Sequence, residues 1–377
     1  MENEQEKIRE EGIVMEKNFS IERKELTCIL INIITSKMLF SYPRGIVETS
    51  GNAAWIQTIY VSLISCLFFW FVIFIYRKAE MKSIIELCNE IGGRPLKIFV
   101  GIILTAVLLF NSSLTMRTLP ESIKTVILPL TPLRLVLLVM GIAIAFGAYM
   151  GIFSIARIHS IFIPIAGVFL AALFILLLPN TDITNIFPVL GKGTYNIFVN
   201  GLTAVSLFSD MILLFILLPL CRNYERVKSA SHRALIISSI VNVLILVFYN
   251  LVYSYPSAEE FLLPVFQMTR LIKIGDFFQR LEAFFEFVWS FAILLYSSLY
   301  LFCLCRIWKE VFDLKFYKPL ILPFCVIMCA VSFLPSSSVN MLNLQKISSL
   351  ITIPVSFLCP VILVLLFNRK RKLRDTK

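Results

Sequence analysis

The sequence predicts an all-α polytopic membrane protein with about ten transmembrane helices. Three observations support this fold class. Hydrophobic residues make up 58% of the 377 residues, charged residues make up 16%, and the mean hydropathy is +0.85, which exceeds the usual composition of a water-soluble domain. Many apolar stretches reach the length of about 20 residues with which a helix crosses a bilayer. The alternating strands of roughly ten residues that form a membrane β-barrel are not seen.

The hydropathy pattern divides the chain into a membrane domain and two charged ends. We expect a cytoplasmic N-terminal segment over 1–24, a membrane domain over 25–367 and a basic cytoplasmic tail over 368–377. The first of these segments is charged throughout and lacks the apolar core of a cleaved signal peptide. The predicted spans are 25–47, 53–76, 97–117, 132–152, 157–179, 199–221, 232–255, 276–306, 319–335 and 345–367.

The basic residues are distributed as a membrane topology requires. Of the 35 Lys and Arg residues, 25 lie in or beside the predicted cytoplasmic segments, nine in or beside the outer ones, and Lys37 inside a span. This asymmetry follows the positive-inside rule and places both termini in the cytoplasm. The net charge of +11 therefore indicates orientation in a lipid bilayer, and no nucleic-acid partner is expected.

No pattern of catalytic or metal-binding residues emerges. The two histidines, His159 and His232, fall near cytoplasmic helix ends, and no metalloprotease, nucleophile-elbow or nucleotide-binding fingerprint is present. Most of the nine cysteines lie inside apolar runs, where cysteine behaves as a small hydrophobic residue. We therefore expect neither an enzyme nor a bound metal or cofactor.

Polar residues in the middle of apolar spans are the informative ones, because a charge there costs about 2.5–3.5 kcal/mol on insertion scales. Two polar interruptions stand out, at 35–37 in the first span and at 206–210 in the sixth. These spans begin the two halves of the membrane domain, 25–179 and 199–367, which is where inverted-repeat transporters place their discontinuous helices. The sequence therefore predicts a 5+5 inverted repeat with broken helices 1 and 6.

Broken helices expose backbone N–H and carbonyl groups that can hold an ionised ligand near the membrane midplane. The sixth span contributes the run 206–210, and a polar patch around Asn111 in span 3 could line the same cavity. The alternative for each Ser and Thr is a hydrogen bond to its own helix backbone. The candidate ligand-binding residues are Thr35, Ser36, Lys37, Asn111, Ser206, Phe208, Ser209 and Asp210.

Four titratable residues are candidates for ion coupling or gating. Lys37 has three interpretations: it pairs with an acidic residue, it extends to an interface, or it occupies the position of a coupling ion. Asp210 is its nearest candidate partner if spans 1 and 6 cross. Glu282 and Glu286, four residues apart near the outer end of span 8, form either a solvated helix end or part of a cation or proton path.

Five stretches of the chain share the pattern of a known family: Phe40-Ser41-Tyr42-Pro43-Arg44, Ala53-Ala54-Trp55-Ile56, Pro188-Val189-Leu190-Gly191-Lys192-Gly193, Pro264-Val265-Phe266-Gln267-Met268 and 274–282. Through them the chain resembles the spore germination permease family, the B subunits of nutrient germinant receptors, within the amino acid/polyamine/organocation superfamily. The likeness covers essentially the whole membrane region in order, and its most specific part is the entry into helix 8. One departure lies at 36–39, where many permease relatives are rich in glycine and this chain has Ser-Lys-Met-Leu.

The resemblance implies a ten-helix inverted-repeat fold and a small nutrient germinant, typically an amino acid, bound beside broken helices 1 and 6. It also implies residence in the spore inner membrane, in a complex with an A subunit and a lipoprotein C subunit. The alternative is an ion-coupled amino acid transporter, because both functions need the same pocket.

Overall fold

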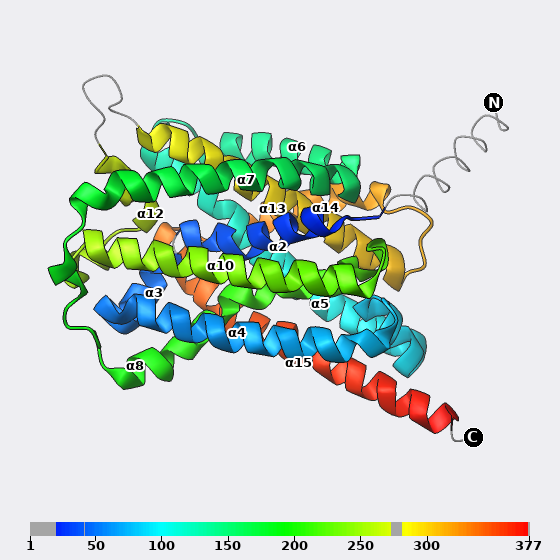
Figure 1. Ribbon diagram of the computed structural model, residues 1–377. Helices are drawn as coiled ribbons and strands as arrows, with labels where there is room; N and C mark the ends of the chain where they lie inside the picture. The colour runs from blue at the N-terminus through cyan, green and yellow to red at the C-terminus, as the bar shows by residue number, and fades with distance from the viewer. Residues whose placement is uncertain (1–19, 41, 273–280, 376–377) are drawn as a thin grey trace.

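The structure is a computed structural model that describes residues 20–40, 42–272 and 281–375. These residues form a single helical bundle in which no strand is present (Figure 1). The predicted all-α fold class is therefore confirmed. The principal helices are α2 (Arg23–Thr35), α3 (Tyr42–Ser50), α4 (Ala54–Tyr76), α5 (Ile84–Val126), α6 (Leu133–Met150), α7 (Ile152–Leu177), α8 (Thr194–Phe198), α9 (Ile212–Leu217), α10 (Tyr224–Val252), α11 (Tyr255–Ala258), α12 (Pro264–Arg270), α13 (Leu281–Val311), α14 (Ile321–Ser332) and α15 (Ser338–Asp375).

Eight helices of the described chain are long and apolar enough to cross a membrane. The prediction was ten, and the difference lies in the first and ninth spans. The first is interrupted after α2, which has only 13 residues. The ninth is represented by α14, which has 12 residues and at 1.5 Å per residue is too short to cross a hydrocarbon core of about 30 Å.

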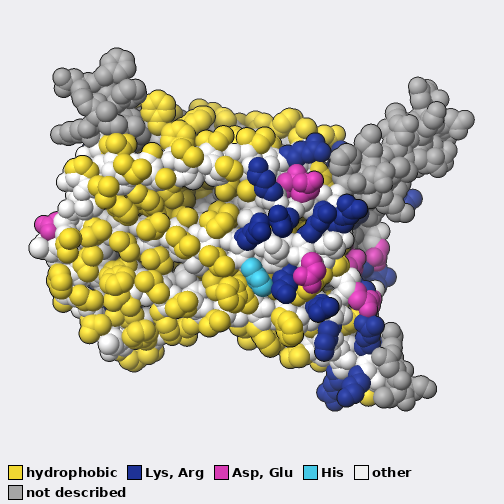
Figure 2. Space-filling view, in the orientation of Figure 1, with side chains coloured by type: hydrophobic (Ala, Val, Ile, Leu, Met, Phe, Trp, Pro, Cys, Tyr) yellow, Lys and Arg dark blue, Asp and Glu magenta, His cyan; other side chains and the backbone are white. Residues whose placement is uncertain are grey.

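The surface of the bundle fits a lipid environment. Hydrophobic side chains cover most of the face in Figure 2, whereas Lys and Arg side chains gather at the end where α2 begins and α15 ends. We call this the terminal end and the opposite one the distal end. Exposed basic residues of the terminal end include Arg77, Lys78, Arg157, Arg222, Lys315 and Lys318.

Local sequence signals explain several helix boundaries that differ from the predicted spans. The helix expected at 232–255 begins at Tyr224, because the Asn223 side chain accepts a hydrogen bond from the Arg226 N–H at 3.0 Å and caps α10. α6 and α7 are separated only by Gly151, whose φ of +85° allows a sharp reversal. Similarly, Gly93 has a φ of +67° and separates a short helix at 84–92 from the long membrane part of α5.

The first and sixth spans are interrupted as predicted. After α2 the chain forms a 3-10 turn, η1 (Ser36–Leu39), and α3 then begins at Tyr42. In the sixth span, α8 is followed by a long 3-10 segment, η6 (Asn200–Met211), before α9. α2 and η6 pack against each other, and the segment that contains η6 is the most deeply buried of the eight candidate spans. Both interruptions therefore lie inside the bundle, while the inverted repeat and the boundaries of its two halves stay predictions.

The loop over 180–198 is hydrogen-bonded to the distal ends of α3 and α10. The Asp182 N–H donates to the Leu251 carbonyl at 2.8 Å, and the Lys192 ammonium group lies 2.5 Å from Glu259 Oε1. Partial burial lowers the pKa of Lys192, but its contacts with Glu259 and Tyr255 outweigh this effect and raise that pKa. The lysine therefore holds the two long distal loops together as a cation.

Candidate functional site

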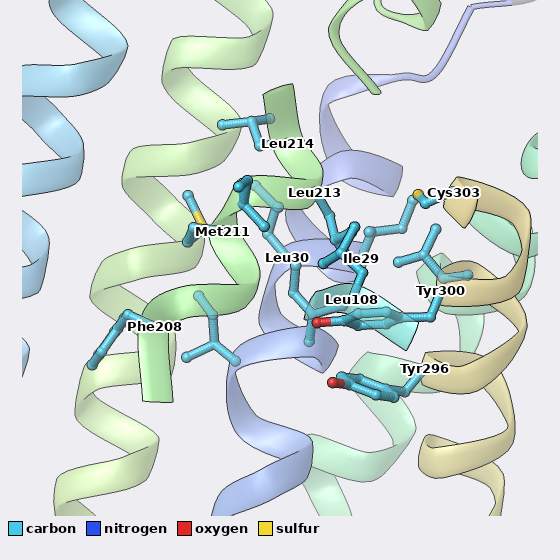
Figure 3. Packing of buried hydrophobic residues seen from close by; sticks show 14 of the residues in the cluster. Ile29, Leu30, Leu108, Phe208, Met211, Leu213, Leu214, Tyr296, Tyr300 and Cys303 are labelled. Carbon is cyan, nitrogen blue, oxygen red and sulfur yellow. The ribbon is translucent and has the colours of Figure 1, made fainter. Parts of the chain in front are cut away.

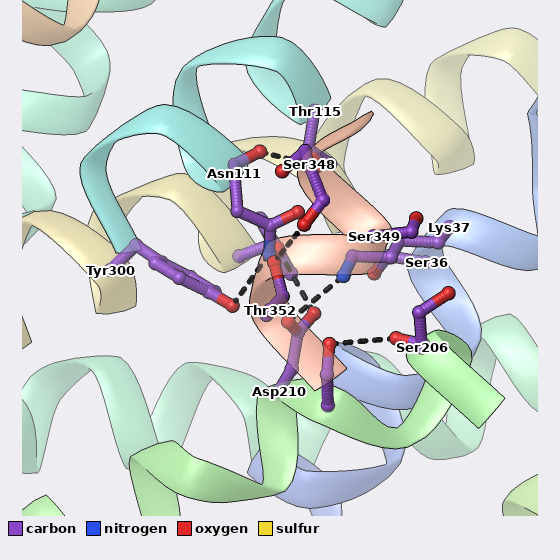
Figure 4. A network of polar contacts seen from close by, with 12 residues as sticks. Ser36, Lys37, Asn111, Thr115, Ser206, Asp210, Tyr300, Ser348, Ser349 and Thr352 are labelled. Carbon is purple, nitrogen blue, oxygen red and sulfur yellow. Dashed lines mark hydrogen bonds and ion pairs between the residues drawn. The ribbon is translucent and has the colours of Figure 1, made fainter. Parts of the chain in front are cut away.

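The centre of the candidate site is the carboxylate of Asp210, which is fully buried in η6. Its Oδ1 lies 2.9 Å from Lys37 Nζ and accepts a hydrogen bond of 3.0 Å from Asn111 Nδ2. The Tyr296 hydroxyl donates to Oδ2 at 3.0 Å. These donors come from η1, α5 and α13, so one carboxylate joins four elements (Figure 4). Three donors, one of which is the Lys37 cation, stabilise an ionised carboxylate in a low-dielectric interior.

Of the three interpretations of Lys37, the structure shows the ion pair with Asp210. The Lys37 side chain is 10% exposed, which rules out extension to a membrane interface. The chain leaves helical geometry at Phe40 and resumes it at Tyr42, where Pro43 lacks an N–H and suits the first turn of a helix. The helix break thus positions the lysine beside Asp210. A role in ligand binding or ion coupling stays a prediction.

The predicted serines and threonines mostly bond to their own backbone, as the alternative interpretation held. Ser209 donates to the Ser206 carbonyl at 2.7 Å, and Thr35 donates to the Ile31 carbonyl at 2.7 Å. Ser36 donates to Asn32, at 2.6 Å to the backbone carbonyl and 2.9 Å to Oδ1. These bonds satisfy the hydroxyl donors and help to shape the two interruptions.

Ser206 also makes a contact between the two broken spans. Its hydroxyl lies 2.5 Å from that of Tyr42, and Tyr42 also reaches the Ala204 carbonyl at 3.2 Å. Tyr42 belongs to α3 and Ser206 to η6, so this contact lies on the distal side of the Lys37–Asp210 pair. It forms a second link between the spans.

Two polar cavities adjoin Tyr42. The outer cavity, of about 310 Å³, lies at the distal ends of α3 and α15 and is lined by polar and charged side chains that include Arg44, Glu48 and Lys346. We call it the vestibule. The inner cavity, of about 30 Å³, is lined by residues that include Lys37 and Asn111. Both cavities are lined by Tyr42, Gln345 and Ser349.

The volumes distinguish what each cavity can hold. A volume of about 310 Å³ falls at the lower end of the range for small-molecule sites. The inner cavity accepts no more than a few water molecules. The vestibule therefore has room for a small molecule, and Tyr42, Gln345 and Ser349 lie between it and the inner cavity, which Lys37 lines.

A larger cavity of about 620 Å³ lies beside α2, α7, α10 and α13. Its described lining is almost entirely apolar and contains no charged side chain, which suits hydrocarbon rather than a zwitterion. Thr35 lines this cavity and neither of the polar ones. Thr35 is therefore separated from the Lys37–Asp210 site.

Three further predicted residues lie away from both polar cavities. Phe208 is fully buried in the apolar core formed by α2, α5, η6 and α13 (Figure 3). Glu286 is buried on α13, while Glu282 one turn earlier is half-buried. The helix 8 entry at 274–280, together with Ser41 and residues 1–19, lies outside the described residues.

Several residues of the site were missed by the sequence analysis. Tyr296 and Tyr300 both come from α13: the Tyr296 hydroxyl donates to Asp210, and the Tyr300 hydroxyl accepts a hydrogen bond of 3.4 Å from Asn111 Nδ2. Their polar neighbourhood of serines and tyrosines over 296–300 was an available signal. On α15, Ser348, Ser349 and Thr352 belong to the same polar network (Figure 4). Their spacing of three and four residues places polar groups on one face of the helix, which was a second signal in the sequence.

Comparison with known proteins identifies what the chain is similar to. Residues 20–341 match a family described as spore germination protein. Spore germination protein A2 of Bacillus subtilis (strain 168) is 22% identical over 270 residues, covering 69% of this chain and 72% of the relative. Spore germination protein B2 of the same organism is 19% identical over 257 residues, covering 67% and 69%. Spore germination protein YndE is 21% identical over 271 residues, covering 70% and 74%. The resemblance found in the sequence is thereby confirmed.

Proposed function

Because this chain belongs to the spore germination protein family, we propose that it is the membrane subunit of a nutrient germinant receptor. In this proposal it binds a small germinant, an amino acid, and signals germination through a conformational change. Its partners are an A subunit and a lipoprotein C subunit in the spore inner membrane, and both of its termini face the cytoplasm. Membership of the family supports a role in spore germination. The charged groups of the candidate site support an amino acid as the ligand.

The observation that carries the ligand class is the placement of opposite charges along one access path. Arg44 donates through Nε to Glu48 at 2.9 Å, which leaves its terminal guanidinium nitrogens to face a ligand carboxylate in the vestibule. Behind the Tyr42–Ser206 contact, Asp210 supplies the counter-charge for an ammonium group. In this proposal the ligand carboxylate faces the Arg44 guanidinium in the vestibule, and the ligand ammonium group faces the Asp210 carboxylate at the inner end of the path.

Displacement of Lys37 links binding to a conformational change. An ammonium group that reaches Asp210 replaces the Lys37 ammonium, which currently occupies Oδ1 at 2.9 Å. Because Lys37 and Asp210 lie on the two interrupted spans, replacing their direct contact alters how these spans are joined. This is a differential interaction of the kind that a ligand needs to shift a conformational equilibrium.

The test is equilibrium binding and uptake of a labelled amino acid panel by the purified protein in proteoliposomes, with and without a proton gradient. The proposal predicts saturable binding without accumulation, and weaker binding by Asp210→Asn. The matched control is Glu260→Gln, which changes an exposed carboxyl in a distal loop. If no amino acid binds, with or without the A and C subunits present, the proposed ligand class is wrong.

A second candidate function is an ion-coupled amino acid transporter. The observation that favours it is the pair of interrupted spans with a buried charge pair between them, an arrangement found in secondary transporters. Gradient-driven accumulation of an amino acid in the same proteoliposomes would identify a transporter.

A further inference from the structure

A buried carboxyl group on α13 takes no part in the site described above. Glu286 is 3% exposed, and its Oε1 has no hydrogen-bond partner among the described residues. An unpaired carboxylate is unfavourable in a low-dielectric interior, so a carboxyl group in this place is held as the neutral acid unless positive charge approaches it.

None of the charged groups that the structure describes around Glu286 serves as its counter-ion. Arg117 is paired with Glu121 at 2.6 Å and donates to the Ser332 carbonyl, and none of the described cations forms an ion pair with Glu286. On α13 itself, Glu282 lies one turn away. The charged or titratable side chains in the distal halves of the elements packed against α13 are Lys37 on η1, Arg117, Glu121 and Lys124 on α5, Arg134 on α6, Arg270 on α12 and Cys329 on α14.

A stripe of uncharged polar residues on α5 runs between Glu286 and the ion pair. Asn111, Thr115, Thr118 and Ser122 follow a spacing of four, three and four residues, which places them on one face of the helix. We call them the α5 polar stripe. It extends about 16 Å along the helix at 1.5 Å per residue, and α5 packs against α13.

The two ends of the α5 polar stripe touch the two carboxyl groups. Asn111 donates to Asp210, and the Ser122 hydroxyl, which is buried and makes no hydrogen bond of its own, faces the Glu286 carboxyl group. Between them, Thr115 and Thr118 line the inner cavity together with Lys37. Their hydroxyls donate to carbonyls of α5 at 2.9 and 2.6 Å, so their oxygen lone pairs remain available to a water molecule or an ammonium group.

We infer that Glu286 is a proton-binding site linked to the Lys37–Asp210 pair through the α5 polar stripe and the inner cavity. This inference rests on the proposed function for its ligand. When a germinant ammonium group takes the place of Lys37 at Asp210, the freed Lys37 ammonium enters the cavity lined by Thr115 and Thr118. The added positive charge favours ionised Glu286, whose carboxyl O–H bond breaks and releases one proton to water.

The direction of the pH dependence follows from this proton balance. Binding that releases a proton becomes stronger as pH rises through the titration range of Glu286, by up to about tenfold per pH unit for one proton. Above that range Glu286 is already ionised, and binding loses its dependence on pH.

Infrared difference spectroscopy of the full chain in nanodiscs tests the proton site without any ligand. The wild-type protein should show the carbonyl band of a protonated carboxylic acid that Glu286→Gln removes and Glu260→Gln retains. Asp210→Asn leaves Lys37 without its carboxylate and should reduce the Glu286 band at neutral pH. A wild-type spectrum without a band assignable to Glu286, or a band unchanged by Asp210→Asn, overturns the inference.

Proton release tests the link to ligand. An equimolar mixture of the twenty protein amino acids is added to the protein in weakly buffered nanodiscs that contain a pH indicator. Wild type and Glu260→Gln should release up to one proton per bound ligand, and Glu286→Gln should bind but release none. Equal release by Glu286→Gln overturns the inference while leaving the proposed function intact. Absence of binding contradicts the proposed function, and the infrared result then decides whether Glu286 responds to the ion pair.

Discussion

Lys37 Nζ on η1 and Asp210 Oδ1 on η6 lie 2.9 Å apart and join the two interrupted spans of the bundle. Both side chains are withdrawn from water and lipid, because Asp210 is fully buried and Lys37 is 10% exposed. Each charge is therefore stable in its position only while the other is present.

Removing one member of the pair should destabilise the protein more than removing both. Asp210→Asn or Lys37→Met leaves an uncompensated buried charge, which costs about 3–5 kcal/mol. The double variant removes both charges and should recover much of that loss. Thermal unfolding in detergent measures the three variants against the wild type. A double variant with the summed loss of the single ones would show that the charges do not stabilise each other.

Loss of the Tyr42 hydroxyl should strengthen amino acid binding with a small effect on stability, because the Tyr42–Ser206 contact no longer has to break when a ligand passes Tyr42. Tyr42→Phe removes contacts to Ser206 and to the Ala204 carbonyl, a change of about 0.5–1.5 kcal/mol for a hydrogen bond. The matched control is Tyr249→Phe, which removes a buried bond of 2.7 Å to the Ala258 carbonyl. Equilibrium binding in proteoliposomes measures the amino acid affinity of both variants against the wild type. Equal binding affinity in the two variants would remove Tyr42 from the access path.

The ion pair between Lys346 and Glu48 should limit access to the vestibule. Lys346 Nζ lies 2.9 Å from Glu48 Oε2 and ties α15 to α3. Because the pair is partly exposed, its strength is about 0–1 kcal/mol and falls with salt. Lys346→Ala should raise the rate at which a water-soluble thiol reagent modifies Ser349→Cys, up to several-fold at low salt.

The control for that experiment is Lys370→Ala, which removes exposed contacts to the Glu90 and Ile91 carbonyls at the terminal end. Protein without the introduced cysteine measures the background from the native thiols. An unchanged modification rate in Lys346→Ala would show that the ion pair does not restrict entry.

Gly191→Ala should destabilise the distal loop. The φ of Gly191 is +48°, and a Cβ there would lie 2.0 Å from the Ser50 carbonyl oxygen and 2.8 Å from the Ala53 nitrogen. The left-handed conformation alone costs alanine about 1–2 kcal/mol, and the backbone contact adds to that cost. Gly167→Ala, in an α7 position with nothing within 4 Å, should be neutral or stabilising by up to about 1 kcal/mol. Thermal unfolding of both variants checks the difference, and equal midpoints would contradict it.

The sequence alone located the two interruptions because a polar residue stands out in an apolar span whichever residue it pairs with. Thr35, Ser36 and Lys37 stand out in an apolar span wherever the rest of the chain lies, and the run around Asp210 does the same. The pairing of Lys37 with Asp210 was one of several interpretations, and hydropathy has no means to select it. By contrast, Tyr296 and Tyr300 are ordinary residues for a membrane helix, so their contacts with Asp210 and Asn111 were not foreseen.

Hydropathy and charge determined the class of protein, the order of the apolar spans and the places where helices break, because each depends on the solvent preference of residues near one another in sequence. The tertiary structure decided which groups meet. It paired residues 173 positions apart in the Lys37–Asp210 contact, and it placed Glu286 where none of the described cations forms an ion pair with it. It also divided the access path into a vestibule of about 310 Å³ and an inner cavity of about 30 Å³. These outcomes depend on how the helices pack in three dimensions, since the volume of a cavity and the charge around a buried group are set by side chains from distant parts of the chain.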